Sequence, residues 1–336
     1  MKKNAVFAAL IAAVALAGFL IYDGVFNKTA SADFFAMNTY VTAEITGRDS
    51  AECAEEAQKI VENLDTAVLS RTAENSVVYR INLNGAGEID EKTAGYVSKL
   101  IEVCEKSGGA FDFTLGSVSD LWSFGSSPAV PDSEKLSQAL SHSGYKKITL
   151  SGDRIEKSDK EATLDFGAAG KGIALDEIKS CLESRKVKNA VVSVGGSVLL
   201  FGKKEFTVGI RDPFGNSGSY VAKLGVSDCC VSTSGCYEQQ FEQGGKKYHH
   251  ILDPETGYPV DNGLLSVTVI SKSGLLSDAL STACFVLGIE KGSALAREYG
   301  CTAIFIDEDK NIHVEGDSGI IEITDGAYSL RSGHEH

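Results

Sequence analysis

The sequence predicts an α+β fold, with mixed sheets and packed helices, behind an N-terminal membrane-spanning or signal segment. Some segments repeat apolar residues at helical spacing, whereas others alternate apolar and polar residues as strands do. The two kinds are interspersed without a regular strand–helix–strand repeat. The chain has 336 residues, of which 43% are hydrophobic, and this is enough for one large core or two modest domains.

The first 32 residues are predicted to be a targeting segment. Lys2 and Lys3 precede an uncharged, mostly apolar stretch over residues 5–22 that is long enough to cross a bilayer. Ala30-Ser31-Ala32 resembles a signal-peptidase site, although it lies far from the apolar stretch. We therefore expect an anchor over residues 1–32, or an exported chain if the segment is cut. A single domain over 33–330 is then expected outside the cytoplasm.

The first part of this domain alternates between strand and helix patterns. Residues 34–45 alternate as a strand. Apolar faces predict helices over 50–69, with Ser50 as N-cap, and over 92–107, ended by Gly108-Gly109. The remaining expectations here are a short helix or turn over 76–82, a surface loop over 128–131, and strands over 147–151, 154–157 and 163–166.

The second part is richer in strand patterns. Helices are expected over 278–288 and 292–298. Strands are expected over 189–194, 206–210, 229–232, 264–271 and 302–306, and a terminal meander over 312–314 and 320–323.

Charge and cysteine content exclude two classes of site. The formal net charge of -14 argues against a nucleic-acid surface, which would be basic. The eight cysteines include no C-x-x-C pair of the zinc-binding kind. Because Cys104, Cys229 and Cys284 lie in apolar runs, we expect mostly free, buried thiols.

Aromatic residues gather after the glycine pair. Phe111 and Phe113 flank Asp112, and the only tryptophan, Trp122, follows. Such rings could stack on a planar ligand that the carboxylate also binds. The alternative is a loop filled by core aromatics, which this pattern alone slightly favours.

A small-residue turn over residues 165–172 joins a strand pattern to a helix pattern. Its glycines and alanines would let a phosphate approach the free N–H groups of the helix start, and Lys171 adds a positive charge. The turn matches neither the P-loop nor G-x-G-x-x-G. A tight strand-to-helix connection explains the glycines equally well.

Two further groups of residues suggest chemistry. His249 and His250 end a strand pattern just before the Asp253-Pro254 turn, and an imidazole held there is suited to be a general base. Asp278 and Thr282 are one helical turn apart and share a face, which suits a hard cation such as Mg²⁺. The alternatives are a structural histidine and a plain charge near a helix N-terminus.

Taken in order, these motifs resemble those of the ApbE-type FAD:protein FMN transferases, or flavin transferases. The resemblance covers residue 37 to about residue 288. Two departures are Phe113, where the family usually has proline, and Ser281, where some members carry a second metal-binding aspartate. The matching motifs are Met37-Asn38-Thr39, Ser70 with residues 76–82, Gly109-Ala110-Phe111-Asp112-x-Thr114, Leu164-Asp165-x-Gly167-x-x-Gly170-Lys171-Gly172, Val194-Gly195-Gly196, Thr233-Ser234-Gly235, His250-Ile251-x-Asp253-Pro254-x-Thr256-Gly257 and Asp278-x-x-x-Thr282.

The resemblance implies a flavin-transferase fold and an enzyme that binds FAD as substrate together with Mg²⁺. It implies transfer of FMN to a threonine or serine hydroxyl of an acceptor flavoprotein of redox or electron-transport type, with release of AMP. His250, rather than His249, is the implied base. The implied metal ligands are Asp278, Thr282 and a backbone carbonyl near Gly170, and the implied flavin-nucleotide contacts are Met37, Tyr79, Ala110, Phe111, Asp112, Asp165, Lys171 and Ile251.

Three other functions are compatible with the same motifs. The protein could store FAD without transferring it, or hydrolyse FAD to free FMN and AMP. It could also be a membrane-anchored structural domain that uses none of these residues. Covalent flavin on an acceptor protein, in the presence of FAD and Mg²⁺, would separate transfer from all three.

Overall fold

The computed structural model describes residues 27–125, 127–216 and 218–332. The apolar stretch predicted as an anchor, residues 5–22, lies outside the described residues. The sheet begins at Thr29, within the range assigned to the N-terminal segment. Ala30-Ser31-Ala32 lies inside the first strand and pairs with residues 43–45 of the second.

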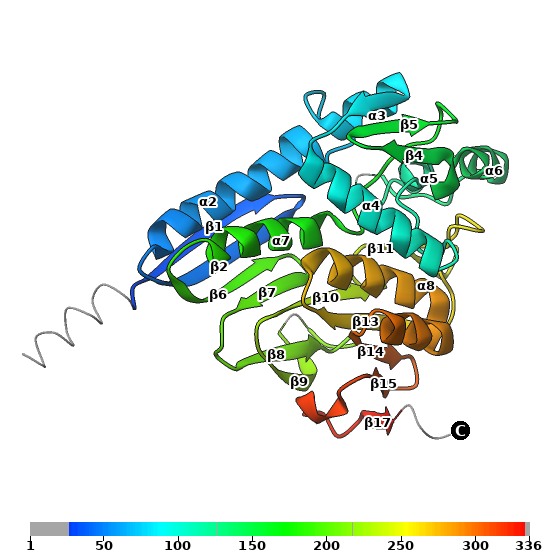
Figure 1. The fold of residues 1–336 in the computed structure, drawn as a ribbon. Helices are drawn as coiled ribbons and strands as arrows, with labels where there is room; N and C mark the ends of the chain where they lie inside the picture. Colours follow the sequence, from blue (N-terminus) through cyan, green and yellow to red (C-terminus); the bar gives the residue numbers. More distant parts are fainter. Residues whose placement is uncertain (1–26, 126, 217, 333–336) are drawn as a thin grey trace, which may run out of the picture.

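A nine-stranded sheet forms the centre of the fold (Figure 1). Neighbouring strands in it are antiparallel, except that the last two are parallel. In spatial order the strands are β1 (Thr29–Ala36), β2 (Thr39–Gly47), β6 (Val187–Val194), β7 (Ser197–Phe201), β10 (Cys229–Gly235), β13 (Leu264–Ser271), β14 (Thr302–Asp307), β15 (Asn311–Glu315) and β17 (Ser329–Ser332).

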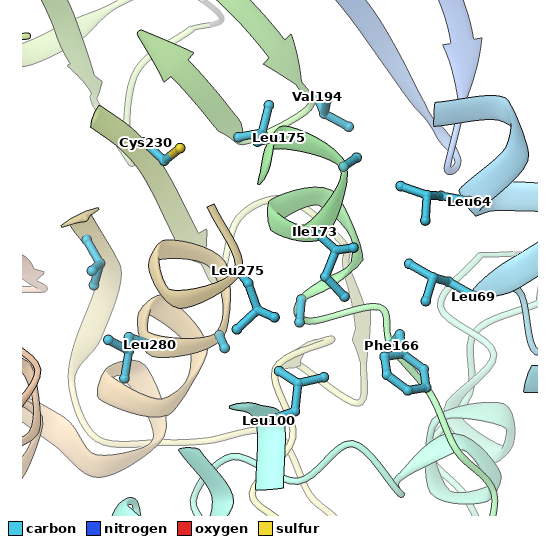
Figure 2. Packing of buried hydrophobic residues seen from close by; sticks show 14 of the residues in the cluster. Leu64, Leu69, Leu100, Phe166, Ile173, Leu175, Val194, Cys230, Leu275 and Leu280 are labelled. Atoms are coloured by element: carbon cyan, nitrogen blue, oxygen red, sulfur yellow. The ribbon is translucent and has the colours of Figure 1, made fainter. Parts of the chain in front are cut away.

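Helices cover one face of this sheet. The three that pack on it are α2 (Ser50–Asn63), α7 (Gly170–Glu183) and α8 (Gly274–Glu298), and α4 (Glu91–Lys106) lies against α8. Their apolar faces meet in the main core, where side chains of α4, α7 and α8 converge (Figure 2). Within the described residues, α8 is the one helix long and apolar enough to cross a bilayer, but half of its most apolar window is buried in the protein. It is the central core helix of this domain.

The opposite face is covered by a three-stranded sheet. Its strands are β16 (Ile321–Ile323), β9 (Tyr220–Val226) and β8 (Phe206–Arg211), in that order. A second apolar cluster fills the space between this sheet and β10, β14 and β15. This double coverage explains why the four central residues of β14 are all apolar and buried, and why five of the eight residues of β13 are buried.

The remaining elements close one end of the molecule. They are α3 (Val77–Asn84), α5 (Gly116–Trp122), α6 (Ser133–His142), a sheet of β3 (Ala86–Glu88), β5 (Arg154–Lys157) and β4 (Ile148–Ser151), and a hairpin of β11 (Gln240–Gln243) and β12 (Lys246–His249). Trp122 of α5 is fully buried in a small third cluster with Val118, Leu136 and Leu252. Single turns of 3-10 helix occur at Tyr145–Lys147 and Ser318–Ile320.

The α+β class is confirmed, but several element boundaries differ from the prediction. Residues 34–45 are not one strand, because Met37 and Asn38 adopt positive φ and turn the chain into a β1–β2 hairpin. Residues 163–166 contribute only one isolated bridge, from Thr163 to Leu115. The two predicted C-terminal helices are continuous in α8, which is broken only at Gly288, where φ is 76°. The predicted terminal meander does not form, because residues 312–314 lie in β15 of the main sheet whereas β16 pairs with β9 in the three-stranded sheet. Strands β3, β7, β9 and β17 and helices α5 and α6 were not predicted.

Two smaller predictions can be compared directly. Helix α2 begins at Ser50, but its N-cap is Asp49, and the helix continues as a π-helical turn over Leu64–Val68. All eight cysteines are free, and six of them are buried. The prediction of mostly free, buried thiols is therefore confirmed.

Candidate active site

Turns and helix starts from separate parts of the chain enclose a cavity of about 180 Å³. The walls are the turn before α5, the turn that leads into α7, the end of β10, the loop after β12, and the first turns of α8. The lining residues are Ala110, Phe111, Asp112, Leu115, Ser119, Asp165, Gly167, Ala168, Lys171, Thr233, Ser234, Glu238, His250, Ile251, Leu252, Pro254, Asp278 and Thr282.

Most of the residues singled out from the sequence meet in this cavity. The ones that line it are Ala110, Phe111, Asp112, Asp165, Lys171, His250, Ile251, Asp278 and Thr282. Met37 and Gly170 line an adjoining cavity of about 220 Å³, which shares Asp165, Gly167 and Lys171 with the first. Tyr79 lines neither cavity and lies half-buried on α3.

His250 is held in the cavity wall, and one of its ring nitrogens has no partner in the described part of the chain. Its backbone N–H donates to the Gln239 carbonyl at 3.0 Å, which fixes the residue beside the β11–β12 hairpin. Its buried Nδ1 has no hydrogen-bond partner among the described residues. Burial, with the positive charge of Lys171 and the neighbouring His249, lowers the pKa of His250 to about 4. The imidazole is therefore neutral near pH 7 and able to accept a proton.

His249 has a different environment. Its Nδ1 accepts from the Ile251 N–H at 3.3 Å, so its Nε2 carries the proton and donates to the Val260 carbonyl at 2.9 Å. The ring also packs edge-on against Phe285, with 5.7 Å between ring centroids. These contacts make His249 a structural histidine, and they favour His250 as the reactive one of the pair.

Asp278 ties three elements together at the base of the cavity. It is 5% exposed, and its Oδ2 accepts from the Gly172 N–H at 2.9 Å while its Oδ1 accepts from Ser197 Oγ at 3.0 Å. Gly172 lies in the first turn of α7, so the carboxylate complements the N-terminus of that helix rather than of its own. Thr282, one turn further along α8, has its Oγ1 3.1 Å from Ser234 Oγ.

This donor set fits Mg²⁺ bound together with substrate phosphates. Asp278, Thr282 and Ser234 offer oxygen atoms in one cavity. Mg²⁺ commonly takes one or two carboxylates and completes its shell with phosphates and water. Nowhere in the described residues do three His, Cys, Asp or Glu side chains group as an all-protein metal site would require. Gly170, the other predicted ligand, is the buried first residue of α7, on the side of the adjoining cavity.

Arg71 was missed in the sequence and organises the wall between the two cavities. Its Nε lies 3.0 Å from Asp165 Oδ2, and its Nη1 lies 2.7 Å from Asp120 Oδ1. Asp165 also accepts from the Gly167 N–H at 2.8 Å. These two ion pairs join three segments that are distant in the chain, and no local sequence motif predicts them.

Asp112 stabilises its own turn as well as lining the cavity. One carboxylate oxygen accepts from the Thr114 N–H and hydroxyl, and the other accepts from the Tyr145 N–H at 2.8 Å. Burial raises the pKa of Asp112, although these hydrogen bonds act in the opposite direction. Phe113 and Trp122 are core residues, since they are 1% and 0% exposed. The Trp122 Nε1–H donates a hydrogen bond to the Gly257 carbonyl at 2.8 Å, which stabilises the turn after His250.

Glu238 is a second residue that sequence reasoning missed. It lines the cavity three residues after the Thr233-Ser234-Gly235 motif. Burial raises the pKa of its carboxyl, whereas Lys171 and Arg211 lower it. Among the described residues that line the cavity, Lys171 is the one cation, and the carboxylates are those of Asp112, Asp165, Glu238 and Asp278.

The model of the ApbE family matches residues 37–305. The chain is 35% identical over 279 residues to the FAD:protein FMN transferase of Treponema pallidum, which covers 76% of each chain. It is 32% identical over 295 residues to the FAD:protein FMN transferase of Klebsiella pneumoniae, covering 85% of this chain and 92% of that one. The crystal structure of the ApbE protein from Thermotoga maritima superposes with a TM-score of 0.76 at 31% identity, covering 89% of this chain and 97% of that one.

Proposed function

Because the chain belongs to the ApbE family and is an FAD:protein FMN transferase, we propose that it moves FMN from FAD to a threonine or serine hydroxyl of its acceptor with the help of Mg²⁺. The observation that carries this proposal is one cavity with three kinds of group. His250 supplies a neutral imidazole whose Nδ1 is unpaired, Asp278 and Thr282 supply oxygen atoms that can bind a metal ion, and Lys171 supplies a positive charge.

The reaction needs a base because a protein hydroxyl is a weak nucleophile. The neutral imidazole of His250 takes the hydroxyl proton as the hydroxyl oxygen bonds to the phosphorus of the FMN half of FAD. The bond from that phosphorus to the bridging oxygen breaks, and AMP leaves with this oxygen on its phosphate.

The remaining polar groups match the anionic part of FAD. When bound, Mg²⁺ would neutralise charge on the pyrophosphate. Asp278, Thr282 and a carbonyl near Gly170 would hold the ion. Lys171 and the N-terminus of α7 face the same region with positive charge. Asp165 and Lys171 line both adjoining cavities. A nucleotide that occupies both cavities would therefore extend past these two residues, from Met37 to the Ala110–Asp112 turn.

Incubation with FAD, Mg²⁺ and a candidate acceptor tests the proposal. Transfer gives covalent flavin fluorescence on the acceptor, with AMP in equal amount. Free FMN with AMP would indicate a pyrophosphatase, and intact bound FAD would indicate storage. The His250→Ala variant serves as a control, because it should bind FAD yet label the acceptor poorly.

We also propose that the enzyme acts outside the cytoplasm on a redox or electron-transport protein, held at the membrane by its N-terminal segment. Lys2, Lys3 and the apolar stretch that follows support this placement. Cleavage after Ala32 would remove four of the eight residues of β1, which favours retention of the segment. Membrane fractionation and protease treatment of intact cells test the proposal, and a full-length chain found in the cytoplasm would contradict it.

A further inference from the structure

A second hollow, of about 560 Å³, adjoins the active cavity and is not lined by Met37. It lies between the turn after α4, the Asp253-Pro254-Glu255 turn, and the part of α8 that follows Val286. The two hollows share Ala110 and Pro254. Apart from Ala110, no residue assigned to flavin or Mg²⁺ lines it. The active cavity therefore adjoins two further hollows, and only the one lined by Met37 carries further nucleotide-binding candidates.

Both walls of this hollow are held in place by local contacts. The Asp253 turn is closed by hydrogen bonds from the Gly257 N–H to the Asp253 carbonyl at 2.7 Å and from the Asp253 N–H to the Tyr258 carbonyl at 2.8 Å. On the other side, Lys106 of α4 pairs with Glu298 of α8 at 3.2 Å. A surface formed in advance in this way loses little conformational freedom when a partner binds.

The chemistry of the hollow suits a polypeptide. Gly108 and Gly109 present no side chains on one side, and a Cβ added at Gly108 would meet nothing within 4 Å, so a partner's backbone can approach closely. Half-buried Val286 and Leu287 and exposed Ala294 offer apolar contact.

We infer that this hollow is the docking groove of the acceptor protein and receives the extended segment that carries the modified hydroxyl. The inference rests on the proposed function, which requires a protein hydroxyl and FAD to enter one cavity together. If the nucleotide extends into the hollow lined by Met37, the acceptor enters by the hollow that shares Ala110 and Pro254 with the active cavity. His250 precedes Pro254 by four residues in the same loop, so a segment entering there reaches the wall that holds the imidazole.

Ala294→Trp tests the docking groove, with Glu290→Trp as the matched control. Both positions are exposed on the same helix, but only Ala294 lines the hollow. The probe is a recombinant acceptor protein that the wild-type enzyme labels with flavin. A large side chain in the docking groove should exclude the acceptor segment and so remove at least the binding energy of one hot-spot contact. Ala294→Trp should therefore raise the KM for the acceptor more than about tenfold. FAD affinity, measured by flavin fluorescence, should stay unchanged, and Glu290→Trp should behave as wild type.

Three results are decisive. An unchanged acceptor KM for Ala294→Trp, with normal wild-type transfer, overturns the docking groove alone. A loss of FAD affinity instead shows that the nucleotide occupies the hollow, and also overturns it. Absence of covalent flavin with the wild-type enzyme overturns the proposed function and the docking groove with it. Thermal unfolding checks that the variants fold. If the Ala294→Trp variant does not fold, Ala294→Arg repeats the test, because arginine is a good helix former.

Discussion

Replacing Gly172 by alanine should damage both the fold and the active site, because helices α7 and α8 cross at this residue. A Cβ on Gly172 would lie 2.1 Å from the Gly274 carbonyl oxygen and 2.7 Å from the Asp278 Cβ. Since ordinary contact begins at 3.4 Å, the oxygen must retreat by 3.4 − 2.1 = 1.3 Å. The obstacle is the α8 backbone at Gly274 and the Cβ of Asp278, so no side-chain rotation can relieve it.

The size of the effect follows from two losses. Forcing an extra methyl group into a packed contact costs about 1–3 kcal/mol. Separating the helices also weakens the hydrogen bond from the Gly172 N–H to the buried Asp278 carboxylate, and bonds to charged groups contribute about 1.5–3 kcal/mol. We expect a total loss of about 3 kcal/mol or more. Displacement of Asp278 by about 1 Å should slow transfer about 10²-fold even in the fraction that remains folded.

Urea unfolding and the flavin-transfer assay measure the two effects separately. Gly95→Ala is the matched control, because Gly95 is an exposed position within α4 and an added Cβ there meets nothing within 4 Å. That change should stabilise the protein by about 0.5–1 kcal/mol and leave transfer unaltered. If Gly172→Ala were as stable and as active as the wild type, the close helix crossing and its link to Asp278 would be wrong.

Three other predictions concern the chemistry. His250→Ala should lower transfer by about 10²-fold or more while His249→Ala keeps most of it; because burial and a nearby cation lower the His250 pKa to about 4, the base stays neutral well below the usual histidine range, and the acid limb of kcat/KM should lie near pH 4. A limb near pH 6.5 would count against this base. Asp278→Ala, or thorough chelation of the wild type, should abolish transfer, and turnover without any divalent ion would refute the metal site. Arg71→Met should raise the KM for FAD by loosening Asp165 and leave the acceptor KM unchanged, with a stability loss of only about 1 kcal/mol because the ion pairs are partly exposed.

The sequence allowed most of the site to be predicted because its residues lie in short motifs next to turns. His250 and Asp278 could each be identified from a motif, and the structure brings both into one cavity. Strand β13 was predicted with its observed bounds, since a run of apolar residues between turns has few other solutions. The choice of His250 over His249 came from the family resemblance, and the hydrogen bonds of His249 now give it a physical reason.

The parts that could not be predicted depend on contacts between distant segments. Arg71 reaches Asp165 and Asp120 across the fold, and nothing beside it in the chain marks those partners. The β1–β2 hairpin was missed because its turn is made by Met37 and Asn38, which adopt positive φ without a glycine. Tyr79, singled out from its motif, lines neither cavity, and its role stays a prediction.

The small-residue turn before α7 shows how one motif serves packing and chemistry together. Its glycines have two possible explanations in the sequence, namely close approach of a phosphate or a tight strand-to-helix connection. Gly172 meets the second need, because α8 crosses so near that the glycine backbones almost touch. The same crossing brings the Gly172 N–H to Asp278 and turns Lys171 into the cavity. A substitution that keeps the turn but separates the helices should therefore reduce activity, even though it changes no residue that contacts FAD.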